Sequence, residues 1–304
     1  MQVQGAFNLL FRAGLRKNFR DEWDRYEPEY PMYLNVASTD EPEQQATIMT
    51  GPSRLFERGD GEPIIYQDPV MGPKVVGVDK EFAGGIMLTR RTVEDDKYGK
   101  ANQAARWLAH AGRMTYEYRA AALLDDAFTG AFFRTIDNKP ICATDHTLLN
   151  SPLVVANRPA TEVALSITGV TALLDIFQHM KDENGDPIRM QPDKLIVSNN
   201  AMDVNVALAI WNSKLEPFTA NNTDNVIARR VPNPTVVISH YKDEGTRSYF
   251  MQDSRYNDAH LLIRRPMEFD DTFDFDTQAA KYSATTRFLV WIVGWQGWAG
   301  ANPT

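Results

Sequence analysis

The sequence has little cysteine and no long apolar stretch, and each shortage excludes a class of protein. Cys142 is the only cysteine among 304 residues, so an intrachain disulfide and a cysteine-based metal knuckle are both impossible. The apolar run from Phe288 to Val293 is far shorter than the roughly 20 residues that cross a bilayer. The N-terminus reaches Arg12 after a brief apolar patch, so we expect neither a signal peptide nor a membrane span.

Basic clusters and phosphate-binding loops are also missing. The net charge is −8 with 43% hydrophobic residues, which is typical of a chain with one or two apolar cores in a reducing cytoplasm. Sequence-reading nucleic-acid binders need clustered Lys and Arg, whereas this chain has isolated pairs at Arg229-Arg230 and Arg264-Arg265. No glycine-rich dinucleotide loop or Gly-Lys-Ser/Thr phosphate loop occurs, so we predict no cofactor.

Two groupings could carry chemistry, and both have a simpler interpretation. Cys142 and His146 could form a thiolate–imidazole pair, which needs hydrogen-bond contact and oxyanion donors; a buried core cysteine beside a turn is the commoner case. Asp182, Asn184 and Asp186 suggest a calcium loop, but Gly185 is misplaced for one, and a polar turn explains them better. We therefore predict no catalytic residues and no metal site.

The strongest pattern is a long helix from Val93 to Thr129. Its apolar residues recur at spacings of three and four, as one buried helical face requires, and Gly130 follows where a helix would stop. About 30 residues at 1.5 Å each make a rod of roughly 45 Å. The predicted buried residues are Ala101, Ala104, Ala105, Leu108, Ala111, Met114, Tyr118, Ala121, Ala122 and Leu124; the predicted exposed ones are Lys100, Gln103, Arg106, Arg113, Glu117 and Arg119.

An amphipathic helix precedes this rod, and its partner is open to two interpretations. Phe7, Phe11, Leu15 and Phe19 recur every fourth residue, and Pro28 follows as a stop. The helix packs either on its own chain or, as an arm, on a neighbouring subunit. The second interpretation gains support because residues 35–51 are polar and resemble a linker.

The remaining chain predicts a β-excursion and an α/β insert. The stretch from Leu55 to Arg91 predicts a two-stranded ribbon with a short strand at Ile64 to Tyr66, which is marginal alone in water and must lie on something. A helix capped by Ser166, a strand at Leu195 to Val197, a helix at Met202 to Trp211 and several short strands follow. The tail is a long β run that ends in tryptophans.

These segments, in this order, resemble those of tailed-bacteriophage major capsid proteins. The likeness covers nearly the whole chain. It is carried by Gly51-Pro52, Gly61-Glu62-Pro63-Ile64, Thr89 to Gly99 before an alanine-rich helix, Ala127-Phe128, Asp137-Asn138-Lys139-Pro140, Thr144 to Leu149, Pro192 to Val197, and Phe288 to Trp291 with Gly294 to Trp298.

The resemblance implies an α+β chain with the Hong Kong 97-type fold. Its parts would be an N-terminal arm at 1–51, an E-loop at 52–91, a peripheral domain with a spine helix at 92–163 plus 261–304, and an axial domain at 164–260. In such proteins the arm and E-loop overlie adjacent subunits. The subunit-interface candidates are Phe7, Phe11, Leu15, Phe19, Arg58, Ile64, Tyr66, Lys74 and Lys80.

The function that the resemblance implies is a head protein that self-assembles, as pentamers and hexamers, into an icosahedral shell around double-stranded DNA. Expected partners are a portal and a separate scaffolding chain, the DNA is held without sequence-specific contacts, and no membrane takes part. The virion capsid is the expected location, after assembly in the host cytoplasm. Two alternatives stay open: an encapsulin-like compartment for protein cargo, and a thiol hydrolase that uses Cys142 and His146.

Overall fold

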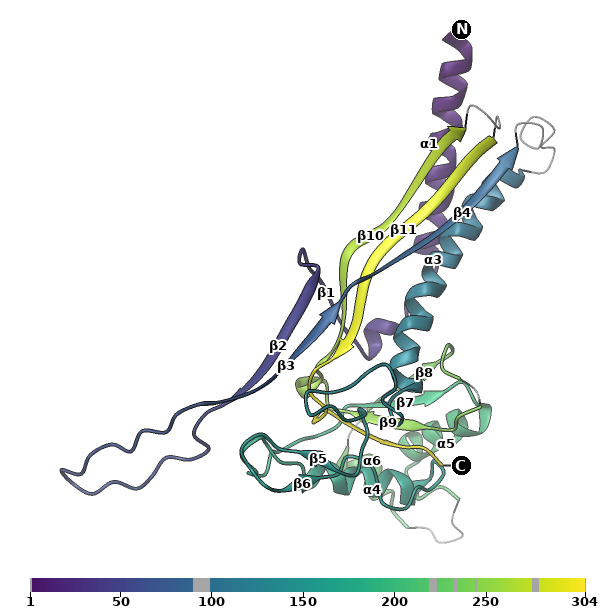
Figure 1. Cartoon of the computed structure of the whole chain (residues 1–304). Coiled ribbons are helices and arrows are strands. Elements are labelled where there is room, and N and C mark those ends of the chain that lie inside the picture. Colours follow the sequence, from purple (N-terminus) through teal and green to yellow (C-terminus); the bar gives the residue numbers. More distant parts are fainter. Residues whose placement is uncertain are drawn as a thin grey trace.

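The protein consists of a long rod, an insert at one end of it, and a thin ribbon that projects from its side (Figure 1). The structure is a computed structural model that describes residues 2–89, 99–218, 223–231, 234–243, 245–274 and 279–303. The side chains of residues 2–13, 100, 101 and 273 lie outside this description, as do the main-chain segments between the ranges. The predicted helix start at residues 93–98 therefore falls outside the described residues.

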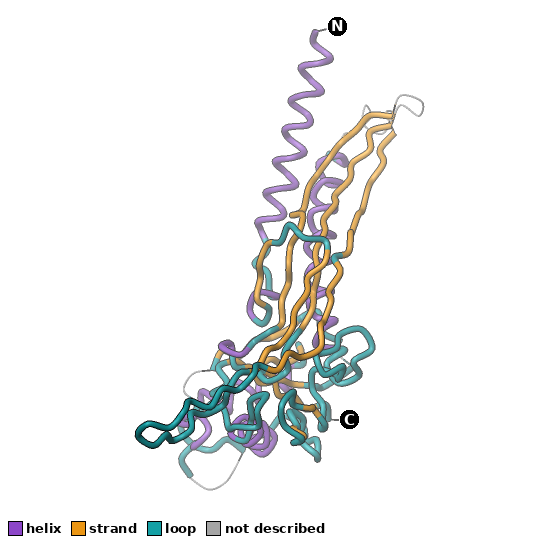
Figure 2. Tube along the Cα trace, turned by 60° about the vertical axis from the view of Figure 1, so that its left-hand side comes forward, coloured by secondary structure: helices purple, strands orange, loops and turns teal. Residues whose placement is uncertain are grey.

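The rod is a layer of two helices against a layer of long strands. Helix α3 (Lys100–Asp125) lies beside α1 (Gln2–Arg25), and both follow strands β10 (Ala259–Asp274), β11 (Ala279–Ile292) and β4 (Lys80–Thr89) (Figures 1 and 2). The sheet order is β1-β10-β11-β4. Strand β1 (Asn35–Ser38) pairs parallel with β10, and the other pairs are antiparallel. The 26 residues of α3 make a helix about 39 Å long.

The buried face of α3 is confirmed at Ala104, Ala105, Leu108, Ala121 and Leu124 and differs from the prediction at other positions. Tyr118 is exposed, whereas Arg113 and Glu117, predicted to face solvent, are buried. The reason is that the first helix and the segment after it cover this face: the Arg113 guanidinium stacks on the Trp23 ring of α1 and donates to the Trp23 carbonyl, and Glu117 accepts the N–H of Glu29, which follows α1. Partners from another element, rather than apolar spacing, therefore decide which side of α3 is covered.

The spine helix also ends earlier than predicted, because Asp126 captures the chain that follows. Its carboxylate accepts the N–H groups of Ala131, Phe132 and Phe133, each at 2.7 Å. Gly130 has a φ of 62° within this turn, a conformation that glycine adopts without a Cβ penalty. These three hydrogen bonds to Asp126 fix the loop, and the loop holds the exposed Phe132 side chain outward.

The predicted linker at residues 35–51 is wrong, since this segment contains two strands. After the short helix η1 (Tyr30–Met32), β1 joins the rod and β2 (Glu43–Thr50) pairs antiparallel with β3 (Val70–Val78). The short strand expected at Ile64 to Tyr66 is instead irregular chain. We call β2 and β3 the ribbon, and residues 51–69 between them the tip.

The insert holds a second sheet in the order β12-β9-β7-β8. Its core packs around Leu195, Phe177 and the fully buried Trp295. The Ser166 hydroxyl caps α4 by accepting the Gly169 N–H, as predicted. Strand β12 belongs to this sheet although it follows the rod strands in sequence. The remaining elements are β5 (His146–Thr147), β6 (Val154–Val155), α4 (Ile167–Gln178), β7 (Lys194–Ser198), α5 (Ala201–Asn212), α6 (Val226–Arg230), β8 (Thr235–Ser239), β9 (Tyr249–Gln252), η2 (Ser254–Tyr256) and β12 (Trp298–Ala301).

Among the described helices, none combines the length and the apolar character that crossing a membrane requires.

Candidate subunit interface

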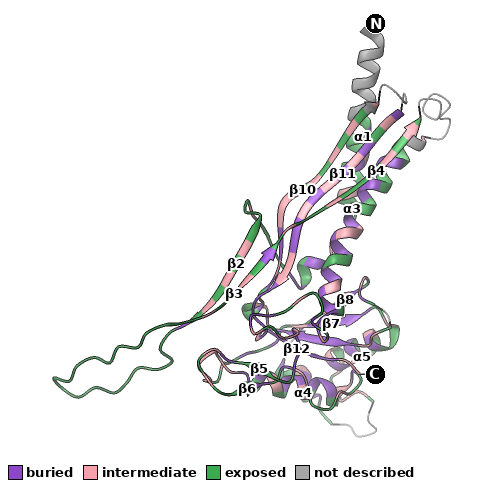
Figure 3. Ribbon diagram, in the orientation of Figure 1, coloured by how far each residue is buried: buried purple, intermediate pink, exposed green. Residues whose placement is uncertain are grey.

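The tip of the ribbon is the least covered part of the described chain. Every residue from 51 to 69 is exposed. Gly51 and Arg54 at the base of the tip contact the turn of the insert at Asn184 and Asp186, and the rest of the tip projects away from the rod and insert (Figure 3). Large apolar side chains lie there in the open, since Leu55 is 96% and Tyr66 86% exposed, and Ile64 is also exposed. A loop that points apolar side chains into water is a candidate surface for another protein.

The basic interface candidates lie along the same excursion. Arg58 is in the tip, Lys74 is in β3 and Lys80 begins β4, and all three are exposed. The structure thus brings Arg58, Ile64 and Tyr66 together at the tip, while Lys74 and Lys80 lie nearer the body. Their contacts with a neighbouring subunit stay a prediction.

The first helix differs from the prediction for two of its residues. Leu15 is 1% and Phe19 7% exposed, and both pack within their own chain against Ala105, Leu108 and Tyr282. The Phe19 ring also stacks on Phe269 with centroids 4.9 Å apart. The expectation that Leu15 and Phe19 dock on a neighbour is therefore wrong, because their own rod already covers them.

The other two residues predicted on this helix lie further along it. Phe7 and Phe11 belong to the same helix α1. Their side chains lie outside the described residues, so a contact with a neighbour stays a prediction for them.

A second exposed surface on the rod was missed in the sequence. A shallow hollow lies between β4 and α3, lined by Phe82, Met114, Tyr118, Arg119 and Ala122. The Arg119 guanidinium lies 5.1 Å from the centre of the Phe82 ring. Periodicity assigned Met114 and Tyr118 to the buried face, whereas Met114 is half-buried and Tyr118 is exposed. Aromatic and arginine side chains are the types enriched where proteins meet.

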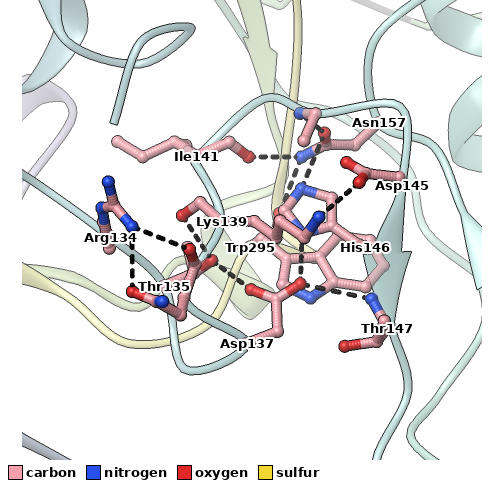
Figure 4. A network of polar contacts seen from close by, with 12 residues as sticks. Arg134, Thr135, Asp137, Lys139, Ile141, Asp145, His146, Thr147, Asn157 and Trp295 are labelled. Atoms are coloured by element: carbon pink, nitrogen blue, oxygen red, sulfur yellow. Dashed lines mark hydrogen bonds and ion pairs between the residues drawn. The ribbon is translucent and has the colours of Figure 1, made fainter. Parts of the chain in front are cut away.

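The His146 imidazole, considered for catalysis with the Cys142 thiol, belongs to a network of polar contacts with other residues (Figure 4). His146 is buried and stacks on Trp295 with ring centroids 4.2 Å apart. Its Nδ1 lies 2.8 Å from the Asp137 carboxylate and its Nε2 3.1 Å from the Asn157 amide oxygen. Both ring nitrogens thus have partners other than Cys142. A histidine that acts as general base for a thiol needs one ring nitrogen directed at the sulfur.

The thiol itself is in an apolar core. Cys142 has no exposed surface, and burial raises the pKa of its thiol well above the usual range. A reactive cysteine has the opposite properties, an accessible position and a depressed pKa. Burial also opposes ionisation of Asp137, but hydrogen bonds from His146, Thr135 and Thr147 outweigh it and lower the pKa of that carboxyl. The cluster therefore joins the β5 region to the insert as a structural network.

The calcium-like segment is a polar turn in the structure. Asp182 accepts the N–H groups of Asn184 and Asp186 within it, and Asp186 pairs with Arg54 of the tip. Among the described residues no group of three or more His, Cys, Asp or Glu side chains is arranged to hold a metal ion.

Comparison with known proteins gives one family and one fold. The model of the phage capsid protein family matches residues 74–301, which is most of the chain. Among curated proteins, none matches it significantly.

The solved structures that are similar have low sequence identity and so show the fold alone. The capsid of cyanophage P-SCSP1u is 11% identical, with a TM-score of 0.56 over 89% of this chain and 86% of that one. Mycobacterium phage Bobi gives 11% identity and a TM-score of 0.55 over 92% and 91%. A virus-like particle from Pyrococcus furiosus gives 8% and 0.51 over 96% and 99%.

Proposed function

Because this chain belongs to the phage capsid protein family and is a major capsid protein with the Hong Kong 97-type fold, we propose that its copies close a shell through the tips of their ribbons. The protein is structural, assembles with copies of itself and belongs to the virion capsid. In our proposal each tip lies over the body of an adjacent copy, within hexamers and pentamers.

The exposed tip carries this proposal. Residues 51–69 are all exposed, and Leu55, Ile64 and Tyr66 are among them. Burying apolar surface stabilises by about 25 cal/mol per Å², so covering the tip against a neighbour adds stability at every copy of the shell. Ordering the loop opposes part of this gain. The tip therefore stabilises the shell through many copies of one modest contact rather than through a single strong contact.

The proposal includes the surroundings of the shell. The net charge of −8 suits a wall that encloses double-stranded DNA without gripping it, because strong phosphate binding would oppose packing and release. We place assembly in the host cytoplasm, with a portal and a separate scaffolding protein as partners. The net charge supports the proposal that the shell encloses DNA. The portal and the scaffolding protein are proposed because the chain is a phage capsid protein.

The test removes the tip and leaves the body intact. Residues 55–67 are replaced by a short Gly-Ser linker. Because this segment has three acidic residues and one basic residue, a Glu57→Gln, Asp60→Asn double variant, which also removes two negative charges, is the matched control for altered charge. We expect the truncated chain to be soluble and folded by circular dichroism, yet to form no closed particles by sedimentation and negative-stain microscopy. Wild-type particles from the truncated chain would contradict the proposal. Truncation of the tip is cleaner than deletion of α1, which also removes the buried Leu15 and Phe19.

The similarity to the virus-like particle of Pyrococcus furiosus favours one second candidate, a compartment for protein cargo. The particle contents distinguish the two functions. Nuclease-protected double-stranded DNA in particles from the native source supports a capsid, whereas a co-purified protein inside nucleic-acid-free shells supports a compartment.

A further inference from the structure

The ribbon joins the rod at two places, through residues 39–42 between β1 and β2 and through a single residue between β3 and β4. Strand β3 ends at Val78 and β4 begins at Lys80, and only Asp79 lies between them. The first strand pairs with β2 in a two-stranded sheet, and the second pairs with β11 in the rod. A two-stranded ribbon is marginal on its own, so its direction depends on whatever holds this joint.

Two arginines from the centre of the rod hold Asp79. Its side chain is nearly buried, and Arg264 Nη1 lies 3.2 Å from Oδ2. The Arg287 Nη2 donates to Oδ1 at 3.2 Å, and its Nε lies 3.1 Å from Oδ2. One carboxylate thus ties the joint to β10 and β11 at the same time.

The strand carrying Arg264 is irregular at this point. In the pairing of β10 with β11, Ile263 lies opposite Phe288 and Arg265 opposite Arg287. Arg264 is therefore the extra residue of a bulge. Bulges re-aim a side chain at a local loss of ladder hydrogen bonds, and here the re-aimed guanidinium reaches Asp79.

At Gly77 the ribbon crosses β11 so closely that only glycine, which has no side chain, fits. A Cβ at Gly77 would lie 2.6 Å from a Leu289 methyl and 2.8 Å from the Trp291 ring. The other strand is held at its far end. Thr50 donates to the Asn184 amide oxygen at 2.7 Å. Both strands of the ribbon are thus anchored to their own chain.

We propose that Asp79, with Arg264 and Arg287, is a positioning clamp that sets the angle of the ribbon before a neighbouring copy is met. The chain from residue 60 to Val78 spans up to about 60 Å at ~3.3 Å per residue. Whenever the Thr50 contact with Asn184 opens, a tilt of about 10° at the joint would displace the tip by about 10 Å, enough to miss a partner surface. Preorganisation of this kind lowers the ordering entropy lost on binding.

The effect of the clamp on shell assembly rests on the proposed function, whereas its effect on the angle of the ribbon can be measured without assembly. Lys74→Cys and Gln103→Cys place spin labels on β3 and α3, both at exposed sites, while the buried native Cys142 stays unlabelled. Pulsed electron paramagnetic resonance on the monomer fraction then reports the spread of ribbon angles. We expect a narrow distance distribution in the parent chain and a broad one with Asp79→Asn.

The matched control is Glu81→Gln. It removes the exposed Glu81–Arg265 pair of 2.7 Å from the same sheet and should leave the distribution narrow. Assembly is measured on the same variants without labels: Asp79→Asn should lose closed shells, and Glu81→Gln should keep them. If Asp79→Asn does not fold cooperatively, Arg287→Lys, which keeps the charge and loses the two-point contact, is measured in its place.

The outcomes separate the two proposals. A narrow distribution in Asp79→Asn overturns the clamp, and so does a broad distribution combined with normal shells. A broad distribution with lost shells supports it. Normal shells from the tip-truncated chain would instead overturn the proposed function, whatever the labels report.

Discussion

The first helix and the tip of the ribbon have similar apolar side chains and opposite surroundings. Leu15 and Phe19 are covered by the rod of their own chain, while Leu55 and Tyr66 face water. Apolar residues alone therefore do not tell which part of this chain awaits a neighbour. What separates the two is whether another element of the same chain lies within reach, and this is a property of the fold.

Phe19→Ala should give the largest change and would break the comparison if it failed. Removal of a buried aromatic ring that stacks on Phe269 should lower the free energy of unfolding by about 3 kcal/mol. Urea denaturation of the dilute monomer, followed by circular dichroism, measures it. A loss of less than about 1 kcal/mol would mean that this helix packs on another copy.

Glu117→Gln should give the next largest change and sharpens the description of where the segment after the first helix meets α3. Burial, opposed in part by the Glu29 N–H, raises the pKa of Glu117 to about 7 from an unfolded value of 4.5. The folded chain then binds a proton that the unfolded chain has released, so stability falls as pH rises from about 4.5 to 7. At 1.36 kcal/mol per pKa unit the loss approaches about 3 kcal/mol.

Thermal unfolding between pH 5 and 8 tests this sign. The Gln variant should match the wild type near pH 5, where Glu117 is protonated, and exceed it at pH 8. Parallel profiles of the two proteins across the range would show that Glu117 does not titrate in this window.

Tyr66→Ser should give the smallest change in stability. An exposed side chain without intramolecular cover is expected to alter the free energy of unfolding by no more than about 0.5 kcal/mol. The same substitution should reduce the yield of shells, measured by sedimentation. A clear loss of monomer stability would show that the tip folds back on its own body, and the contrast with Phe19 would disappear.

The sequence predicted the elements of the rod better than their contacts. Periodicity identified the spine helix, and the capping residue Ser166 identified α4, because both signals are local. Periodicity placed Glu117 on the exposed face and Tyr118 on the buried face. Both assignments are wrong, since the elements that cover α3 are distant in the chain. Periodicity also missed β2, whose exposed and half-covered residues alternate without the apolar pattern of a strand packed on a core.

The candidate interface was predictable only in part, because local turn signals can be read from the sequence and contacts between distant residues cannot. Turn residues such as Gly61 indicated an excursion, and the exposed Ile64 and Tyr66 lie on it. No sequence signal pointed to Asp79, because its arginine partners are about two hundred positions away and one is re-aimed by a bulge that has no signature in composition.

The pairing of β1 with β10 has a consequence for synthesis of the chain. Asn35 lies opposite His260, and Phe19 packs on Phe269, so Phe19 and Asn35 cannot complete their contacts until β10, more than two hundred positions later, has been made. Domains elsewhere fold from the N-terminus as they emerge, whereas this rod is completed only once β10 and β11 have been synthesised. A nascent chain that stops before β10 therefore lacks both the partner strand of β1 and the ring that covers Phe19.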